Sequence, residues 1–336
     1  MLLQENNVKL KDKPNNRLNN KSNDKLNNKQ INKLNNKQNN TSNNKPLTAG
    51  QLRKKQEKQQ RFVRAIIQLI FFISMPSAFV AGFSGVKYLF NQIGTGSVLE
   101  ATSFVVTLIG LCGFTILFGR YFCGYVCAFG SLGDCIYWIS GLVQTKVFQK
   151  KKQFSLPEGC FGILQKVKYM ILALIVILCT FGVYGKFSGT SPWDVFSMIT
   201  AGRFVFNGYT VGVVLLLLIV AGMAAQERFF CQFLCPMGAV FALLPILPVS
   251  ILKRQKANCG KNCSVCQKKC PVHLGLEEDS LLSGECIRCG KCAQVCPKGN
   301  IHDVGGKLSG NELWLVAGKG ILFFAMGVML GLCRFF

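Results

Sequence analysis

The cysteines between residues 286 and 297 carry the clearest chemical signal in this sequence. Four of them follow the spacing Cys286-x2-Cys289-x2-Cys292-x3-Cys296, and Pro297 comes directly after the last one. In this spacing three thiolates of one tight loop ligate the irons of a 4Fe–4S cubane, while the fourth is held away and ligates a second cluster. The spacing therefore predicts iron–sulfur centres and does not suit a disulfide framework.

A second run of four cysteines lies upstream and ends in the same way. It reads Cys259-x3-Cys263-x2-Cys266-x3-Cys270-Pro271, and its first gap is one residue longer than the usual spacing. A pair of zinc knuckles is the alternative, but zinc sites seldom use eight cysteines with two Cys-x3-Cys-Pro ends. We therefore expect two 4Fe–4S clusters, each completed by the last cysteine of the other run. Cluster one is predicted to take Cys259, Cys263, Cys266 and Cys296, and cluster two to take Cys286, Cys289, Cys292 and Cys270.

Four more cysteines lie in an internal repeat. Residues 119–127 read GRYFCGYVC and residues 227–235 read ERFFCQFLC, at a separation of 108 residues. If each motif stays helical, its cysteines lie at positions i and i+4 on one side, so the two pairs together would present four thiols. Soft thiolates select iron–sulfur clusters, zinc or Cu(I); the alternative is that small buried residues only permit tight helix packing. The repeated residues are Arg120, Cys123, Cys127 and Gly130 in one copy and Arg228, Cys231, Cys235 and Gly238 in the other.

The repeated arginines, Arg120 and Arg228, have two interpretations. Each could extend its charge to the polar surface of a membrane while its stem stays in apolar surroundings. Each could instead neutralise a cluster or bind the headgroup of a quinone. The residues alone leave both interpretations open.

The elements that must position these motifs are apolar segments near the ~20 residues needed to cross a bilayer. The loops after the first and third segments hold few basic residues, whereas the N-terminal flank, the connection after the second segment and residues 228–307 are rich in Lys and Arg. Because positive loops stay in the cytoplasm, we expect the N-terminus and the cysteine-rich segment to face the cytoplasm. The candidate spans are residues 65–83, 101–118, 169–185 and 209–225, with residues 313–333 as a fifth.

Two other apolar stretches, residues 128–143 and 236–252, are expected to be interfacial or re-entrant helices.

The fold class that follows is an α-helical membrane protein with 4–5 transmembrane helices as a 2+2 pseudo-repeat, joined to a small α+β lobe of the bacterial two-cluster type. The expected domains are a membrane domain at residues 61–252, the two-cluster lobe at residues 253–304 and a C-terminal apolar helix at residues 305–336.

Residues 1–60 form a separate compositional domain, dominated by Asn, Lys and Gln, in which the unit KLNNKQ occurs twice. Such a segment buries too little apolar surface to offset its ordering entropy, so we expect a disordered cytoplasmic tail. Up to residue 64 the chain holds 16 Lys and Arg residues against 4 acidic ones, which is half of the net charge of +24. No folded nucleic-acid-binding domain accompanies this charge, so we expect no nucleic-acid partner. We expect the basic tail to be attracted to anionic lipid.

Composition excludes several classes of protein. Of the 336 residues, 50% are hydrophobic and only 16% are charged, which is rare in a soluble enzyme. The only histidines, His273 and His302, lie in the cysteine-rich segment, which excludes a multi-haem centre with bis-histidine ligands. We therefore expect no haem. The sequence also has no Gly-rich dinucleotide fingerprint after a strand and no P-loop, so we expect no NAD site and no ATP site.

The order of the motifs resembles a known family. Residues 61–303 hold an apolar pair, a Cys-x3-Cys, a second apolar pair, a Cys-x3-Cys-Pro and the double cysteine run. This order is similar to the NapH/NosR-type membrane-bound 4Fe-4S ferredoxin family of quinol dehydrogenase membrane components, and to the copper-handling accessory ferredoxin of cytochrome oxidase. Pro236 fits the family pattern, whereas Ala128 stands where the family has proline. The resemblance implies electron transfer between a membrane quinone, the membrane thiol site and the two clusters, with a separate flavin or cytochrome protein as redox partner.

We therefore expect a membrane-bound iron–sulfur electron-transfer protein, as an oxidoreductase subunit or quinol dehydrogenase in the cytoplasmic membrane of a bacterium. One alternative is an accessory protein that binds or reduces copper at the four repeat cysteines. Another is a redox regulator of a membrane respiratory system, whose N-terminal tail contacts a partner. The expected cofactors are two 4Fe–4S clusters, with a third iron–sulfur cluster or copper as candidates for the repeat cysteines.

Overall fold

The computed structural model describes residues 49–98, 100–148, 158–203, 208–247, 252–254, 256–260, 263–274, 280–281, 284–303 and 312–333. The chain divides into two units, Met1–Lys54 and Lys55–Phe336, and the site described below lies within the second. Residues 1–48 of the predicted tail lie outside the described residues. Residues 49–60 of that tail form the first turns of helix α2 (Ala49–Ser74).

The first predicted span, residues 65–83, is not one helix. α2 ends at Ser74 and α3 (Ala78–Thr95) begins after Pro76, and the two helices are bent by 61° at this break. Proline has no N–H and its ring collides with the preceding turn, so it interrupts the backbone ladder at this point. The predicted stretch is therefore two bent helices and not one continuous helix, and a membrane crossing by this pair stays a prediction.

Four further helices fall on predicted spans. α4 (Ser103–Phe118) and α8 (Thr210–Ala225) match their segments closely, α13 (Glu312–Met329) covers most of the fifth, and α6 (Glu158–Thr180) starts earlier and stops five residues before the predicted end. Among the described residues, one helix is long and apolar enough to cross a membrane, at Phe161–Thr180, or two if the bent α2–α3 pair counts as one span. The other three apolar helices are shorter. The four or five spans and the 2+2 arrangement therefore stay predictions.

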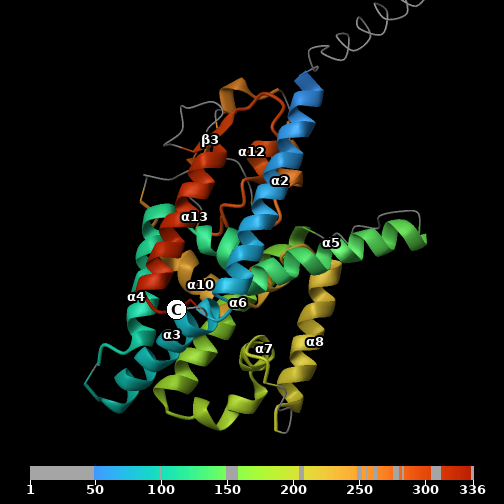
Figure 1. The fold of residues 1–336 in the computed structure, drawn as a ribbon. Coiled ribbons are helices and arrows are strands. Elements are labelled where there is room, and N and C mark those ends of the chain that lie inside the picture. The colour runs from blue at the N-terminus through green and yellow to red at the C-terminus, as the bar shows by residue number, and fades with distance from the viewer. Residues whose placement is uncertain are drawn as a thin grey trace, which may run out of the picture. The chain divides into compact units, whose positions relative to one another are not determined.

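The helices between these segments surround the repeat motifs. α5 (Ala128–Phe148) follows the π-helical turn η2 (Phe122–Val126), and α9 (Phe229–Phe233) is followed by α10. α10 (Pro236–Leu243) ends two residues before Pro245, so the predicted stretch 236–252 is not a single helix. α3 packs on α4 and α6, while α8 packs on α5 and on α7 (Pro192–Thr200), as can be followed in Figure 1.

A small α+β lobe contains the two cysteine runs. Its antiparallel sheet has the order β2-β1-β3, with β1 (Leu252–Arg254) between β2 (Ser280–Leu281) and β3 (Ile301–Asp303). Two short helices, α11 (Val265–Lys268) and α12 (Lys291–Val295), contact each other across the two runs. This part of the predicted fold class agrees with the structure.

The core between the two repeat copies is aromatic. The ring centroid of Phe129 lies 5.2 Å from that of Phe79 and 4.7 Å from that of Phe230, which joins α5, α3 and α9. Phe122 in the first copy and its counterpart Phe230 in the second are both fully buried. These large rigid rings, one pair packed edge to face and the other stacked, hold the two cysteine segments in fixed positions.

Candidate metal centres

The four cysteines predicted for cluster two surround one cavity. This cavity encloses ≈ 340 Å³ of empty space, part of which is open to solvent, and its other walls are mainly apolar, including Val272 and Ile287. One of the four thiols, Cys270, is the last cysteine of the upstream run. Its position here is expected if each run supplies its last cysteine to the cluster of the other run. Thiols from two separate runs around one apolar cavity fit a thiolate-ligated cubane. The four are Cys270, Cys286, Cys289 and Cys292.

The backbone between these ligands turns sharply. Arg288 has a φ of 54° and Gly290 has a φ of 72°, so both residues adopt the left-handed region. Glycine enters that region freely, whereas arginine does so only under local constraint. Two such residues on either side of Cys289 fold the loop tightly enough for its thiols to face a common centre.

The cysteines predicted for cluster one share two polar neighbours. The backbone N–H of Asn300 donates to Sγ of Cys296 at 3.3 Å, and its side-chain amide lies 3.9 Å from Sγ of Cys259. Arg254 contacts Cys259 at 3.8 Å, and its charge acts on Cys263 and Cys266. Asn300 thus links thiols from the two runs, in keeping with the predicted set.

The repeat cysteines do not lie on continuous helices as the i, i+4 argument assumed. Cys123 is part of η2, and Cys127 follows it with extended backbone (φ −58°, ψ 122°). Cys231 is part of α9, and Cys235 caps α10 with nearly the same backbone angles (φ −75°, ψ 110°). Pro236 begins α10 because it needs no donor partner in the first turn, and Ala128 begins α5 in the same place without changing the turn.

All four repeat thiols are buried, and each acts electrostatically on others of the group. Burial raises the pKa of Cys127, Cys231 and Cys235, so bare thiolates are unfavourable there without a metal or a cation. Among the described residues, no three His, Cys, Asp or Glu side chains are spaced to bind one metal ion directly. A cubane places each thiolate on a different iron and so takes more widely spaced ligands than a single ion does.

Each repeated arginine packs against the repeated glycine of the other copy. A Cβ on Gly130 would collide with Nη1 of the Arg228 guanidinium. A Cβ on Gly238 would stand 3.0 Å from Nη2 of Arg120. Since both guanidinium groups are almost fully buried, the glycines repeat because each makes room for an arginine of the other copy.

Arg228 is held by a carboxylate that the sequence analysis missed. Its Nε and Nη2 donate to the two oxygens of Asp134 at 2.7 and 2.6 Å, and Nη2 also reaches the carbonyl of Gly124 at 3.0 Å. Arg64 and Gln68 of α2 donate to the same carboxylate at 2.8 Å each. Burial alone would raise the pKa of Asp134, but the charges of Arg228 and Arg64 outweigh it and hold the pKa well below its usual range.

Arg120 is held by the cluster lobe. Its Nη1 donates to the carbonyl of Gly284 at 3.0 Å and lies 3.2 Å from Glu285. Glu285 also accepts from Lys168, which is fully buried, and from Tyr169. Because Glu285 directly precedes Cys286, this ion-pair group fixes the loop predicted to hold cluster two against α6 and the first repeat copy.

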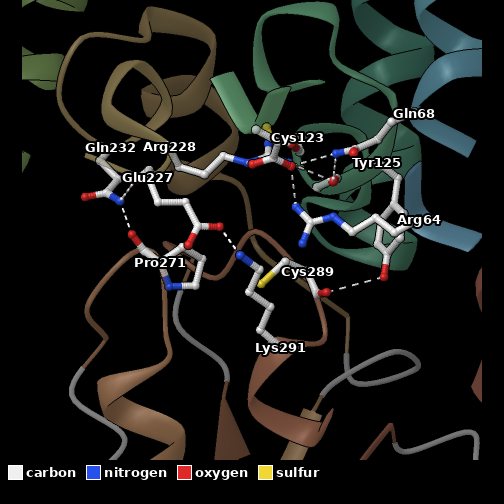
Figure 2. A network of polar contacts seen from close by, with 12 residues as sticks. Arg64, Gln68, Cys123, Tyr125, Glu227, Arg228, Gln232, Pro271, Cys289 and Lys291 are labelled. Carbon is white, nitrogen blue, oxygen red and sulfur yellow. Dashed lines mark hydrogen bonds and ion pairs between the residues drawn. The ribbon is translucent and has the colours of Figure 1, made fainter. Parts of the chain in front are cut away.

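Three more contacts join the lobe to the repeat motifs, as Figure 2 shows. The hydroxyl of Tyr125 donates to the carbonyl of Cys289 at 3.4 Å, Lys291 pairs with Glu227, and Gln232 donates to the carbonyl of Pro271. The loop that would hold cluster two therefore touches both repeat copies.

A sequence signal for Asp134 did exist. It is the only acidic residue between Glu100 and Glu158, and it lies in an apolar stretch. An isolated charge in such a stretch usually has a buried partner or a function. Glu285 lies among other charged residues, so its sequence context gave no comparable signal.

The chain is similar to known iron–sulfur proteins. A family model described as a 4Fe-4S binding domain matches residues 100–153 and 209–254, which contain the two repeat copies, and another with the same description matches residues 283–302. An uncharacterised protein of Methanocaldococcus jannaschii is 31% identical over 71% of this chain and 93% of its own length. The ferredoxin-type protein NapH of Haemophilus influenzae is 29% identical, over 57% of this chain and 66% of its own. The regulatory protein NosR of Pseudomonas aeruginosa is 24% identical, over 53% of this chain and 24% of its own. No solved structure matches.

The lobe, its cysteine-lined cavity and these matches define an iron–sulfur electron-transfer protein. The chain belongs to the NapH/NosR-type family of 4Fe-4S ferredoxins.

Proposed function

We propose that this chain carries electrons between a membrane quinol, or a redox partner protein, and two 4Fe–4S clusters in its lobe on the cytoplasmic side. The observation that carries the proposal is the cavity whose four thiols come from both cysteine runs. A bound cluster would supply one-electron chemistry that no side chain of the protein provides. The cysteines hold it, the apolar walls exclude water, and Asn300 and Arg254 donate toward the thiols of the other set.

The repeat cysteines are proposed as a third redox site next to cluster two. A Cβ on Gly124, which directly follows Cys123, would stand 2.5 Å from the carbonyl of Ile287, so the two cysteine segments are in direct backbone contact. Close approach of two redox sites is what a chain of electron carriers needs. The glycine in the first motif then has a reason, because a side chain would separate the segments.

Charge balance supports an anionic cofactor at this third site. The guanidinium of Arg120 interacts with Cys123 and Cys235, and that of Arg228 interacts with Cys231. Four thiolates around an iron–sulfur cluster carry net negative charge. Arg228 and Arg64 share the carboxylate of Asp134, and Arg120 and Lys168 share that of Glu285, so two positive charges remain to offset it.

Quinol oxidation would release two electrons and two protons. Two 4Fe–4S clusters held by the eight lobe cysteines would supply two one-electron acceptors, which matches the two electrons of a quinol, and the two protons would pass to water. The Lys and Arg distribution supports the cytoplasmic side for the lobe.

The proposal is tested by variants of the purified, oxygen-free protein. Cys270→Ser removes a predicted cluster-two ligand that comes from the other run, so one of the two lobe clusters should be lost from the electron paramagnetic resonance spectrum. Cys179→Ser is the control, since that buried cysteine lies in α6, outside both runs. An unchanged spectrum in Cys270→Ser would contradict the ligand set. Failure of a menaquinol analogue to reduce intact clusters would exclude quinol and leave a protein donor.

A further inference from the structure

A second and larger cavity lies beside the cluster-two loop. It encloses ≈ 790 Å³ of empty space, part of which is open to solvent, and is lined by α2, the π-helical turn, α13 and the lobe. One wall is formed by the stacked rings of Tyr121 and Tyr125, whose centroids lie 4.6 Å apart, and by Phe118 and Val316. Its basic lining residues are Arg64, Arg288 and Lys319, and no carboxylate is among its described lining residues.

Arg288 is the unusual member of this lining. It is 92% buried, and none of its three guanidinium nitrogens has a hydrogen-bond partner in the part of the chain that the structure describes. The equally buried Arg120 and Arg228 each have a carboxylate partner. A buried guanidinium without a counter-ion is strongly unfavourable, so this side chain has the chemistry of an incomplete ion pair.

The position of Arg288 is constrained by its surroundings. Its side chain lies on Gly119, where a Cβ would stand 2.7 Å from Nε, and its backbone has a positive φ. Strained positions of this kind persist where function maintains them. The other two cations are already engaged, since Arg64 pairs with Asp134 and Lys319 lies over the ring of Phe118. Arg288 is therefore the lining residue whose positive charge a ligand would neutralise.

We propose that this cavity binds a phosphate-class oxyanion, with Arg288 as its main ligand. A guanidinium fork matches a phosphate with two parallel hydrogen bonds. The aromatic and aliphatic walls suit the apolar part of an amphiphile. Both bordering helices also carry exposed apolar side chains, such as Ile66 on α2 and Trp314 on α13. The phosphodiester of an anionic phospholipid fits this combination, and free phosphate shares its chemistry.

The lining fits a bound anion better than a quinol being oxidised. Quinol oxidation releases two protons, and neither a histidine nor a carboxylate is among the described lining residues to accept them. An anion next to Arg288 would instead offset positive charge beside Cys289. Because negative charge near a cluster favours its oxidised form, occupancy is expected to lower the reduction potential of cluster two.

The test measures phosphate-containing ligands on the full chain with its clusters present. Native mass spectrometry of protein from lipid nanodiscs should find about one phosphatidylglycerol retained per chain in the wild type. Arg288→Gln should weaken retention about tenfold or more, because it removes a charged, forked donor. Arg288→Lys keeps the charge but not the fork, and should bind with intermediate affinity. Arg203→Gln, at an exposed arginine, should change nothing.

Two further arms identify the source of the anion. Inorganic phosphate that competes with phosphatidylglycerol only when Arg288 is intact would assign the site to the phosphate group itself. If phosphatidylglycerol alone is retained, the lipid is the ligand. Equal retention in wild type and Arg288→Gln, or equal retention of zwitterionic phosphatidylcholine or of a quinone analogue, would overturn the proposal. The cluster spectrum is recorded on the same samples, so loss of the clusters is distinguished from loss of the anion.

Discussion

Gly130 of the first repeat copy lies against the guanidinium of Arg228 in the second, and Gly238 lies in the same way against Arg120. The exchange is reciprocal, so each copy carries a cation that fits only into the other. This relationship brings the two cysteine pairs into one buried group, and it makes the glycines as necessary as the cysteines.

The first prediction concerns the packing of Gly130 against Arg228. Gly130→Ala should destabilise the protein by about 1–3 kcal/mol, because the added methyl group overpacks a site that Arg228 fills. The matched control is Gly113→Ala in α4, where a Cβ would meet nothing within 4 Å. That change should be neutral or slightly stabilising, since alanine is the better helix former. Thermal unfolding of both variants in the same detergent measures the difference, and equal midpoints would contradict the packing argument.

The second prediction concerns the carboxylate shared by Arg228 and Arg64. Asp134→Asn should cost about 3 kcal/mol, because it leaves two buried cations without their counter-charge. Asp194→Asn is the control. Its carboxylate lies 3.8 Å from Lys87 with both side chains partly exposed, so its loss should cost less than about 1 kcal/mol.

The same carboxylate gives a pH dependence with a definite sign. The pKa of Asp134 is lower in the folded protein than in the unfolded chain. Its stabilising contribution is therefore fully present above the ordinary carboxylate pKa of about 4 and is lost as the pH falls toward the folded value. Unfolding midpoints measured between pH 7 and pH 3 should fall more steeply in the wild type than in Asp134→Asn. Parallel curves would show that the ion pair contributes nothing to stability.

The third prediction concerns the acid that precedes a cluster-two ligand. Burial would raise the pKa of Glu285, but Arg120 and Lys168 lower it overall, so the group carries negative charge at neutral pH. Glu285→Gln removes this charge next to Cys286 and should raise the reduction potential of cluster two. Glu100→Gln, at an exposed acid, should leave it unchanged. Potentiometric titration followed by electron paramagnetic resonance measures both, and a downward shift in Glu285→Gln would contradict the assignment.

The fourth prediction separates the repeat site from the lobe. The double variant with Cys123→Ser and Cys231→Ser removes one ligand from each pair and should lose about four irons per chain if the site holds a cubane. The signals of the lobe clusters should remain. Cys112→Ser in α4 is the control, and its iron content should equal that of the wild type. Loss of bound copper with unchanged iron would assign the site to copper.

The cysteine spacing predicts how the lobe ligands group, because ligand spacing on one loop is a local property, and both ligand sets stay predictions. The cavity lined by Cys270, Cys286, Cys289 and Cys292 is consistent with the set predicted for cluster two. The repeat was also visible as a spacing of 108 residues. What periodicity could not give was the break at Pro76, which bends one predicted span into two helices, or the break within each Cys-x3-Cys pair.

The carboxylate partners of the buried arginines could not be predicted from the local sequence. Asp134 lies 94 residues from Arg228 and Glu285 lies 165 residues from Arg120, so only tertiary packing brings them together. The sequence left the arginines between a role at the membrane surface and a role at a cofactor. Both are buried beside thiols and carboxylates in the structure, which favours the second.

Iron and acid-labile sulfide per chain, measured on protein purified without oxygen, test the central claim most directly. About 12 irons with equal sulfide are expected if the lobe holds two 4Fe–4S clusters and the repeat cysteines a third. About 8 irons would keep the lobe clusters and reassign the repeat site. Near-zero iron with stoichiometric zinc would contradict the account of this chain as an electron carrier.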